Sequence, residues 1–261
     1  MNGITMNLTG MRSGGGLAVA GRRGLSGAAL KWIAIIAMTT DHVAWALFPG
    51  FQTNPVALAM HIIGRLTAPI MMFMIVEGFF HTRDRAKYLL RLLAAAVAGH
   101  FAYAFLFGLD PVPLRTGVFN QTSVLWPFAM GLLALMIYRS EKVWLKPWMK
   151  QVLGALCLVA AFPGDWSTPG ALAIVYMGMN HGNFKRQMLL LLLAISFYSI
   201  VYIFAIDPLY GALQMTVALA IPFLRQYNGT RGRFPAKWFF YAYYPLHMAA
   251  IALLIGPTFI F

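Results

Sequence analysis

Ionisable side chains interrupt the longest apolar runs of the sequence. Asp41 and His42 lie in the run LKWIAIIAMTTDHVAWALF, and Arg65 lies in MHIIGRLTAPIMMFMIVEGFF. A charged side chain at the centre of a membrane helix costs about 2.5–3.5 kcal/mol on insertion scales, so such residues are candidates for function. The full set of polar residues inside apolar runs is Asp41, His42, His61, Arg65, Glu77, His100 and His247.

Most of these residues share one depth. The group that falls about ten to thirteen residues from the ends of its runs is Asp41, His42, Arg65, His100 and His247. A shared depth on four helices predicts a central polar cavity, in which the groups pair with one another instead of facing lipid. His61 and Arg65 are four residues apart and share a helix face. Glu77 and His81 have the same spacing nearer the end of the run, where an interfacial ion pair with the loop HTRDRAKY is an equal alternative.

Structural roles are the competing explanation for this set. His100 and His247 would then be neutral histidines that form hydrogen bonds inside the bundle. Asp41 and Arg65 would form a structural ion pair, although buried pairs usually add little net stability, so fold maintenance explains these two residues poorly. We therefore weight function above structure for Asp41, His42 and Arg65.

Metal chemistry is not predicted. His42, His61, His100 and His247 could converge, but no two of them have a ligand spacing on one helix. Cys157 is the one cysteine, which excludes an intramolecular disulfide and a thiolate cluster.

The elements that carry these residues are membrane helices. Of 261 residues, 60% are apolar and 10% are charged, and the mean hydropathy is +0.70. These values exclude a water-soluble enzyme. Apolar runs are separated by short clusters of Lys, Arg, Gly and Pro, which predicts an all-α, polytopic bundle of membrane-spanning helices.

The apolar runs predict about nine transmembrane helices and one orientation. The expected spans are 31–49, 54–80, 88–108, 121–138, 150–163, 168–181, 188–206, 208–224 and 238–258. This count puts the basic clusters on one side, so the positive-inside rule makes the N-terminus cytoplasmic and the C-terminus periplasmic. The opposite loops carry Asp110, Asp165 and Asp207 against Arg115. The runs near 150 and 168 are too short to span, and half-helices or a re-entrant pair are the alternative.

The formal net charge of +13 follows from this topology, so no nucleic-acid partner is expected. Residues 1–28 are rich in Gly, Ser and Arg and lack the apolar centre of a signal peptide, which predicts a disordered basic cytoplasmic tail. Residues 29–261 form a single transmembrane domain with lipid around it. The sequence does not predict an oligomeric state.

Three strings carry a resemblance to a known family. They are LKWIAIIAMTTDHVAWALFP, IIGRLTAPIMMFMIVEGFFHTRDRAKYLLRLL and KWFFYAYYPLHMAAIALL, and the likeness runs with gaps from about residue 29 to 258. The chain resembles the TraX family, the membrane pilin acetylases of conjugative plasmids. It is also similar, more distantly, to transmembrane acyltransferases that use an intramembrane histidine and arginine.

The resemblance implies an acyltransferase of the bacterial inner membrane. Its reaction moves an acetyl group from the cosubstrate acetyl-CoA to the N-terminal amine of a pilin subunit, within the conjugation (type IV secretion) apparatus. It points to His42, Asp41 and Arg65 as site residues. His247, from its place in the last apolar run, is a candidate second base or proton relay. An α-amine with a pKa near 7.7–8.0 needs a base, and an imidazole can supply one. Because adjacent helical residues point about 100° apart, we expect Asp41 to orient a residue on another helix, or His42 through water.

The phosphates of coenzyme A would stay on the cytoplasmic side. A basic cluster next to that side is a candidate for binding them, and its members are Arg83, Arg85, Lys87 and Arg91. Membrane topology alone is the stronger explanation for this cluster, because every expected cytoplasmic loop is basic.

Other functions fit the same sequence. A related enzyme could carry out a different pilin maturation, such as head-to-tail cyclisation with the same amine as nucleophile. A secondary transporter also places Asp, His and Arg near the midplane, although no internal repeat is present. A non-catalytic pilus assembly factor would hold pilin through small-residue contacts between helices.

Overall fold

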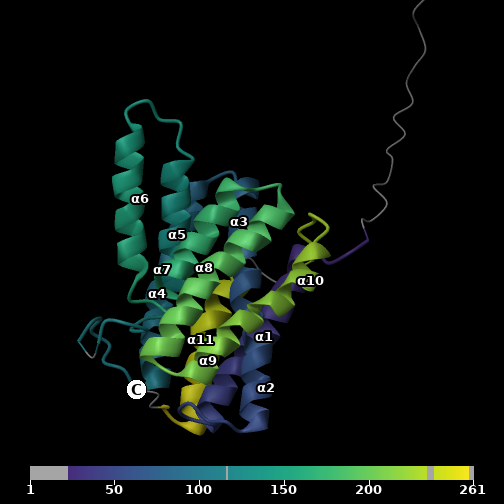
Figure 1. The fold of residues 1–261 in the computed structure, drawn as a ribbon, viewed down its shortest axis with the longest axis vertical. Helices are drawn as coiled ribbons and strands as arrows, with labels where there is room; N and C mark the ends of the chain where they lie inside the picture. The colour runs from purple at the N-terminus through teal and green to yellow at the C-terminus, as the bar shows by residue number, and fades with distance from the viewer. Residues whose placement is uncertain (1–22, 116, 234–237, 259–261) are drawn as a thin grey trace, which may run out of the picture.

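The computed structural model describes residues 23–115, 117–233 and 238–258. Within these ranges every regular element is a helix, and loops join the helices; isolated bridges link Leu25 to Tyr227 and Thr122 to Gly164. The elements are α1 (Gly27–Leu47), α2 (Pro55–Gly64), α3 (Thr67–His81), α4 (Arg85–Phe107), α5 (Leu125–Tyr138), α6 (Pro147–Ala161), α7 (Ser167–Met179), α8 (Phe184–Ala205), α9 (Pro208–Leu213), the 3-10 helix η1 (Gln214–Ala220), α10 (Ile221–Arg225) and α11 (Phe239–Ile255). The all-α prediction is confirmed, and the helices pack as one elongated bundle (Figure 1).

Three helical stretches are long and apolar enough to cross a membrane. They are Pro55–His81, which combines α2 and α3, together with α4 and α8. Helices α5, α6 and α11 are shorter and also apolar. Every apolar run of the sequence therefore contains helix, and the nine-span topology with its orientation stays a prediction.

Polar side chains set the starts of several helices. Ser26 Oγ accepts a hydrogen bond from the Ala29 backbone N–H at the start of α1, and the Asp84 side chain does the same for Lys87 at the start of α4. Such caps satisfy backbone groups that a helix leaves without partners. Asn54, Asn183 and Asp207 cap α2, α8 and α9 in this way.

The described chain begins at residue 23, inside the segment 1–28 that the sequence assigns to the tail. Leu25 bridges to Tyr227, and the backbone N–H groups of Gly27 and Ala28 donate to the carbonyls of Thr230 and Arg231. Residues 23–28 are therefore fixed against the segment that follows α10. The remainder of the expected tail, residues 1–22, lies outside the described residues.

The predicted span 54–80 is two helices. Helix α2 ends at Gly64, and α3 begins at Thr67, with Arg65 and Leu66 between them. Pro69 has no N–H, so it cannot donate to the carbonyl of Arg65 four residues earlier, and the helical ladder is interrupted there. This break places Arg65 at a helix junction instead of in a continuous helix.

The predicted span 208–224 is also divided, because it consists of α9, η1 and α10 in succession. The hairpin of α6 and α7 is short, with 15 and 13 residues, against about 20 for a full crossing. In Figure 1, α6 stands at the edge of the bundle and ends part of the way along it. The turn after α6, residues 162–166, lies against the centre of the protein, as the pocket described below shows.

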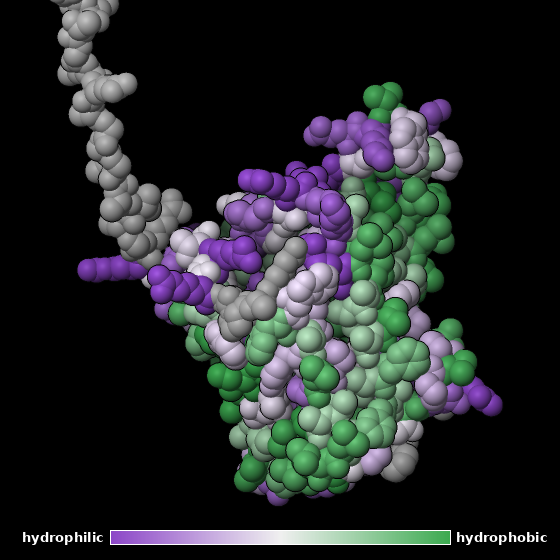
Figure 2. Space-filling view, turned by 180° about the vertical axis from the view of Figure 1, so that it is seen from behind, coloured by the Kyte–Doolittle hydropathy of each residue, from purple (hydrophilic) through white to green (hydrophobic). Residues whose placement is uncertain are grey.

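The outer surface is apolar over most of its length. Large exposed side chains on α8 and α11 include Leu193, Phe197, Phe204, Leu253 and Leu254. Figure 2 shows hydrophilic residues gathered over one end of the molecule and hydrophobic residues over most of the rest of that face. Such a surface suits a lipid environment.

Candidate active site

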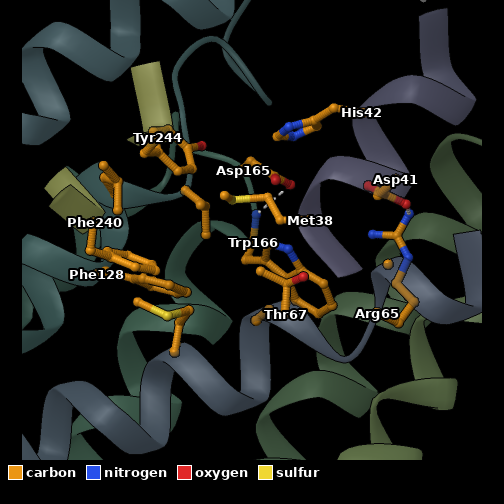
Figure 3. A pocket seen from close by; sticks show the side chains of 15 residues that line it. Met38, Asp41, His42, Arg65, Thr67, Phe128, Asp165, Trp166, Phe240 and Tyr244 are labelled. Atoms are coloured by element: carbon orange, nitrogen blue, oxygen red, sulfur yellow. Dashed lines mark hydrogen bonds and ion pairs between the residues drawn. The ribbon is translucent and has the colours of Figure 1, made fainter. Parts of the chain in front are cut away.

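A small pocket lies where α1, the α2–α3 junction, α5, the α6–α7 turn and α11 meet. It encloses about 50 Å³, whereas one water needs about 10–15 Å³ on the same measure, so it has room for a small group or several waters. Asp41, His42, Arg65 and Asp165 gather at one end, and Phe128 and Phe240 line the other (Figure 3). The pocket therefore joins a polar end to an aromatic end.

His42 and His247 form a hydrogen-bonded pair between the first and last helices. His42 Nδ1 lies 2.7 Å from His247 Nε2, and His247 Nδ1 lies 2.9 Å from the carbonyl oxygen of Tyr243. A carbonyl only accepts, so His247 Nδ1 carries a proton and donates it. In the neutral pair His247 Nε2 must then accept from His42 Nδ1. His42 Nε2 is left without a proton, and its ring lines the pocket.

The Asp41 carboxylate contacts His61 in α2 and Arg65, the residue that directly follows α2. Asp41 Oδ1 lies 2.9 Å from His61 Nδ1 and 3.7 Å from Arg65 Nη2. The expectation that Asp41 orients a residue on another helix therefore agrees with the geometry, and that residue is His61. His61 is fully buried beside Trp45, whose ring centroid is 4.5 Å from the imidazole.

Arg65 keeps hydrogen-bonding capacity. Among the residues that the structure describes, its buried Nε has no hydrogen-bond partner, and the closest carboxylate oxygen, on Asp41, lies beyond hydrogen-bond distance. The guanidinium carbon lies 5.8 Å from the centroid of the Trp166 ring. A cation with unused donors beside a pocket can stabilise an oxyanion that forms there.

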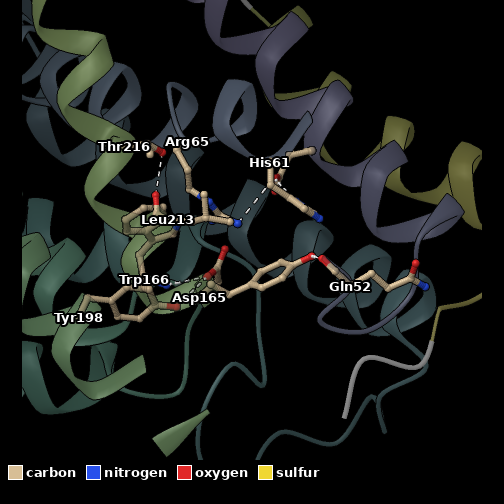
Figure 4. A network of polar contacts seen from close by, with 10 residues as sticks. Gln52, His61, Arg65, Asp165, Trp166, Tyr198, Leu213 and Thr216 are labelled. Atoms are coloured by element: carbon tan, nitrogen blue, oxygen red, sulfur yellow. Dashed lines mark hydrogen bonds and ion pairs between the residues drawn. The ribbon is translucent and has the colours of Figure 1, made fainter. Parts of the chain in front are cut away.

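Asp165 completes the polar end from the α6–α7 turn. Its Oδ1 accepts from the backbone N–H of Trp166 at 2.9 Å and from the hydroxyl of Tyr198 at 3.4 Å (Figure 4). The Asp165 backbone N–H donates to the carbonyl of Thr122 at 2.8 Å, which ties the turn to the segment before α5. Asp165 thus faces the pocket, whereas the sequence suggested only an outer loop.

Sequence reasoning did not single out Asp165, Trp166 or Tyr198 as site residues. The available signal was the length of the neighbouring runs, since two helices too short to span must turn inside the bundle. An acidic residue in such a turn, Asp165, can reach a central cavity. The aromatic residues carried no local signal, because Trp and Tyr are common throughout this chain.

His100 is not part of the pocket, which corrects the expected common cavity. His100 Nε2 lies 2.9 Å from the carbonyl oxygen of Pro111 and donates to it, so this histidine holds the loop after α4. Its Nδ1 is buried without a hydrogen-bond partner among the described residues. The structural explanation for His100 therefore agrees with its position.

Glu77 also lies away from the pocket and has an unexpected partner. Its Oε1 is 2.9 Å from His181 Nε2, in the turn between α7 and α8, and its Oε2 is 3.7 Å from His81 Nδ1. The expected pair with His81 is thus the longer contact. Phe80 stacks on His181 with ring centroids 3.8 Å apart. The cluster fixes the α7–α8 turn against α3.

The basic cluster after α3 makes local contacts. Arg85 Nε donates to the Phe79 carbonyl at 3.4 Å, and Lys87 pairs with Asp84 at 3.3 Å. The Arg91 guanidinium lies 6.0 Å from the centroid of the Tyr88 ring, and Arg83 is exposed. None of Arg83, Arg85, Lys87 and Arg91 lines the central pocket.

A larger groove of about 830 Å³ lies on another side of α3. Its lining includes Phe73, Glu77, His181, Arg225 and Tyr227. Ala68 lines the central pocket and Glu77 lines the groove, and their spacing of nine residues puts them on opposite faces of α3. Helix α3 therefore separates this groove from the polar end of the pocket.

Gly64 allows the close approach of Asp41 to α2. A Cβ at Gly64 would overlap the Asp41 carboxylate. We predict that Gly64→Ala displaces Asp41 from His61 and lowers the free energy of unfolding by about 1–3 kcal/mol, as overpacked sites do. Thermal unfolding of the purified protein in detergent measures this change. Gly117→Ala is the control, because the nearest atom there is the end of the Gln121 side chain, at 3.1 Å; equal unfolding temperatures for the two variants would contradict the prediction.

Comparison with known proteins gives one family. The family model described as TraX protein matches residues 26–255. The chain is 34% identical over 232 residues to the probable fimbrial assembly protein FimC, serogroup H1, of Dichelobacter nodosus, and the alignment covers 85% of this chain and 92% of that protein. No solved structure matches the chain.

Proposed function

The chain belongs to the TraX family, and from that membership we propose that it is a membrane acetyltransferase that modifies the N-terminal amine of a pilin subunit. The proposed acyl donor is acetyl-CoA, and the proposed location is the bacterial inner membrane, with several helices spanning it. The relative from D. nodosus carries a name from fimbrial assembly, which is consistent with a pilus subunit as substrate.

One observation carries the proposal: a histidine nitrogen without a proton faces the same pocket as an arginine with unused donors. The base is His42 Nε2, because the hydrogen bond to His247 at 2.7 Å fixes the proton on His42 Nδ1. The electrophile-stabilising group is Arg65, which lines the same pocket. A base and a fixed cation are what amine acylation requires.

In the proposed reaction, His42 transfers protons and Arg65 stabilises the negative charge that develops. A pilin ammonium first loses one proton to water, and the neutral amine then attacks the thioester carbonyl carbon while His42 Nε2 takes the second nitrogen proton. Arg65 stabilises the oxygen that becomes negative as the C–N bond forms. When the C–S bond breaks, His42 returns its proton to the leaving thiolate. The products are the acetylated amine and the free thiol, and one proton is released overall.

The pocket fits the acetyl end of the donor and not its nucleotide. Its volume of about 50 Å³ accommodates a small acyl group at the polar end. Phe240, near the start of α11, lines the aromatic end, which lies toward the side that the charge pattern makes cytoplasmic. We propose that the donor enters from this end and that the amine enters from the opposite side.

The test is the intact mass of the cognate pilin from cells with the wild-type protein, with His42→Ala, and without the gene. A gain of one acetyl group with the wild type alone supports the proposal. Loss of one water would show cyclisation instead, and identical masses in all strains would point to an assembly factor or a transporter. His81→Ala is the matched control, since that histidine is 62% exposed and lies outside the pocket.

His247 is a positioning residue in this proposal. We predict that His247→Phe lowers kcat about 10–100-fold with a smaller change in KM, because His42 Nδ1–H loses its buried acceptor. His247→Gln should recover part of the activity, since its amide oxygen can accept from His42 and its amide nitrogen can donate to the Tyr243 carbonyl. Single-turnover acetylation of a pilin peptide by the purified protein measures both variants, and equal rates for the two would refute the assignment.

A further inference from the structure

We propose that Asp165 binds the positively charged amine of the incoming peptide, so that the α6–α7 turn is the amine-binding element of the pocket. This inference rests on the proposed function for the identity of the peptide. The site itself is defined by the contacts of Asp165, and nothing in the family description assigns it.

The two oxygens of the Asp165 carboxylate have different surroundings. Oδ1 accepts two hydrogen bonds, from the Trp166 backbone and from the Tyr198 hydroxyl. Oδ2 receives no hydrogen bond from the residues that the structure describes, and the side chain lines the pocket. One oxygen thus fixes the orientation of the carboxylate while the other remains available to a ligand.

Asp165 forms no ion pair within the described part of the chain, and the charge of Arg65 that acts on it from beyond ion-pair distance is shared with Asp41. The ion pairs there involve Asp41, Glu77, Asp84 and Asp110, and Arg65 lies within ion-pair distance of Asp41 and not of Asp165. A partly buried carboxylate without a counterion is costly unless a cation joins it. This end of the pocket holds two carboxylates, Asp41 and Asp165, against the one guanidinium of Arg65, so a cationic ligand would balance its charge.

The surroundings favour an ammonium group. Trp166 and Tyr198 stack beside Asp165, with ring centroids 5.2 Å apart, and the Tyr198 hydroxyl reaches Asp165 Oδ1 (Figure 4). Aromatic faces attract ammonium ions, and a carboxylate accepts their hydrogen bonds. His42 lines the same end of the pocket, so an ammonium held at Asp165, once it has lost its first proton to water, lies where the proposed base can take the second proton.

The small size of the cavity beside the α6–α7 turn favours binding of the terminus of a peptide over an internal segment. The cavity of about 50 Å³ admits a terminal group and excludes a folded chain. Backbone hydrogen bonds at 2.8 Å from Asp165 to Thr122 and at 2.7 Å from Gln121 to Pro163 hold the turn against the segment before α5. A rigid turn with an anchored carboxylate gives specificity for a primary ammonium at a chain end.

The experiment measures binding of a probe, hexylammonium, to the purified full-length protein by isothermal titration calorimetry. Hexanol is the neutral comparison, and Asp207→Asn is the matched variant, because Asp207 lies in another turn and caps α9. We expect Asp165→Asn to weaken hexylammonium binding at least tenfold and to leave hexanol unchanged. Equal hexylammonium affinity for wild type and Asp165→Asn would overturn the inference.

A second measurement uses the unmodified protein and does not depend on the folding of a variant. A hydrophobic carbodiimide activates a carboxyl group, and bound hexylamine then forms an amide with it, with the oxygen leaving on the urea. Peptide mass spectrometry should find this amide at Asp165. Coupling at exposed carboxyl groups without coupling at Asp165 would contradict the site.

These tests separate the two proposals. Hexylammonium binding needs no acyl donor. The binding experiment therefore tests the amine site whether or not the protein transfers acetyl groups. If pilin is acetylated and Asp165→Asn leaves KM for the pilin unchanged, the amine site fails and the acetyltransferase stands. If the amine binds and pilin mass never changes, the acetyltransferase fails and the amine site stands.

Discussion

Under the proposed function, acetyl transfer by His42→Gln is expected to fall about 10²–10⁴-fold, the range in which general-base catalysis contributes. Glutamine fills similar space and can donate to His247 Nε2 as His42 Nδ1 does, but its amide cannot take a proton at neutral pH. The loss should appear in kcat, because the substitution leaves the pocket lining in place. Single-turnover transfer from acetyl-CoA to a pilin peptide, with purified protein in detergent, is the measurement.

The control for this prediction separates chemistry from folding. His81→Gln changes a histidine that lies outside the pocket and should leave the rate unchanged. The unfolding temperature of His42→Gln should stay near that of the wild type. A variant that folds normally and retains full activity would show that His42 is not the base.

The second large effect is expected at Arg65. We predict that Arg65→Gln lowers the rate about 10²–10³-fold, the cost of removing one oxyanion donor in a catalysed acyl transfer. Arg65→Lys should be nearly as inactive, because an ammonium is a compact charge that lacks the fork of the guanidinium. The rate should fall in kcat more than in the KM of either substrate.

Substitution of Arg65 also affects stability, because Arg65 forms an ion pair with Asp41. Loss of Arg65 leaves Asp41, whose Oδ1 is 3.7 Å from Arg65 Nη2, with less compensation, and breaking a buried pair can cost about 3–5 kcal/mol of stability. The double variant Asp41→Asn with Arg65→Gln removes both charges and should regain stability without regaining activity. Activity in a stable double variant equal to that of the wild type would refute the role of Arg65. The single variant Asp41→Asn shows the combined effect of losing the Asp41 charge on its contacts with His61 and Arg65.

The sequence predicts helices well and their interruptions poorly. Apolar runs identify every helix because membrane helices are defined by composition. The break at Arg65 and Leu66 has a local signal in Pro69, which weakens the hydrogen bond to the residue four positions earlier. The succession α9, η1 and α10 within the run 208–224 depends on packing against α8, which the sequence does not reveal.

For the candidate site, too, the sequence predicts some features and misses others. Depth in the apolar runs selects Asp41, His42, Arg65 and His247 correctly as neighbours, and it also selects His100, which lies apart. The contact between His42 and His247 joins residues 205 positions apart, so its tautomer follows only from the three-dimensional structure. Asp165 is not among the candidate site residues from the sequence, because it lies between two apolar runs and not inside one. The turn that carries it nevertheless reaches the central pocket, since both neighbouring helices are short.

The order in which the polar contacts occur along the chain has a consequence for synthesis. Asp41, His61 and Arg65 belong to the first two apolar runs, so in the proposed membrane location their charges can neutralise one another while α1 and α2 insert as a pair. His247 belongs to the last helix, and its hydrogen bond to His42 can form only when translation is nearly complete. A chain truncated before α11 would insert its charged helices and still lack the base in its reactive tautomer. We therefore expect the proposed acetyltransferase activity only after the whole polypeptide has been made.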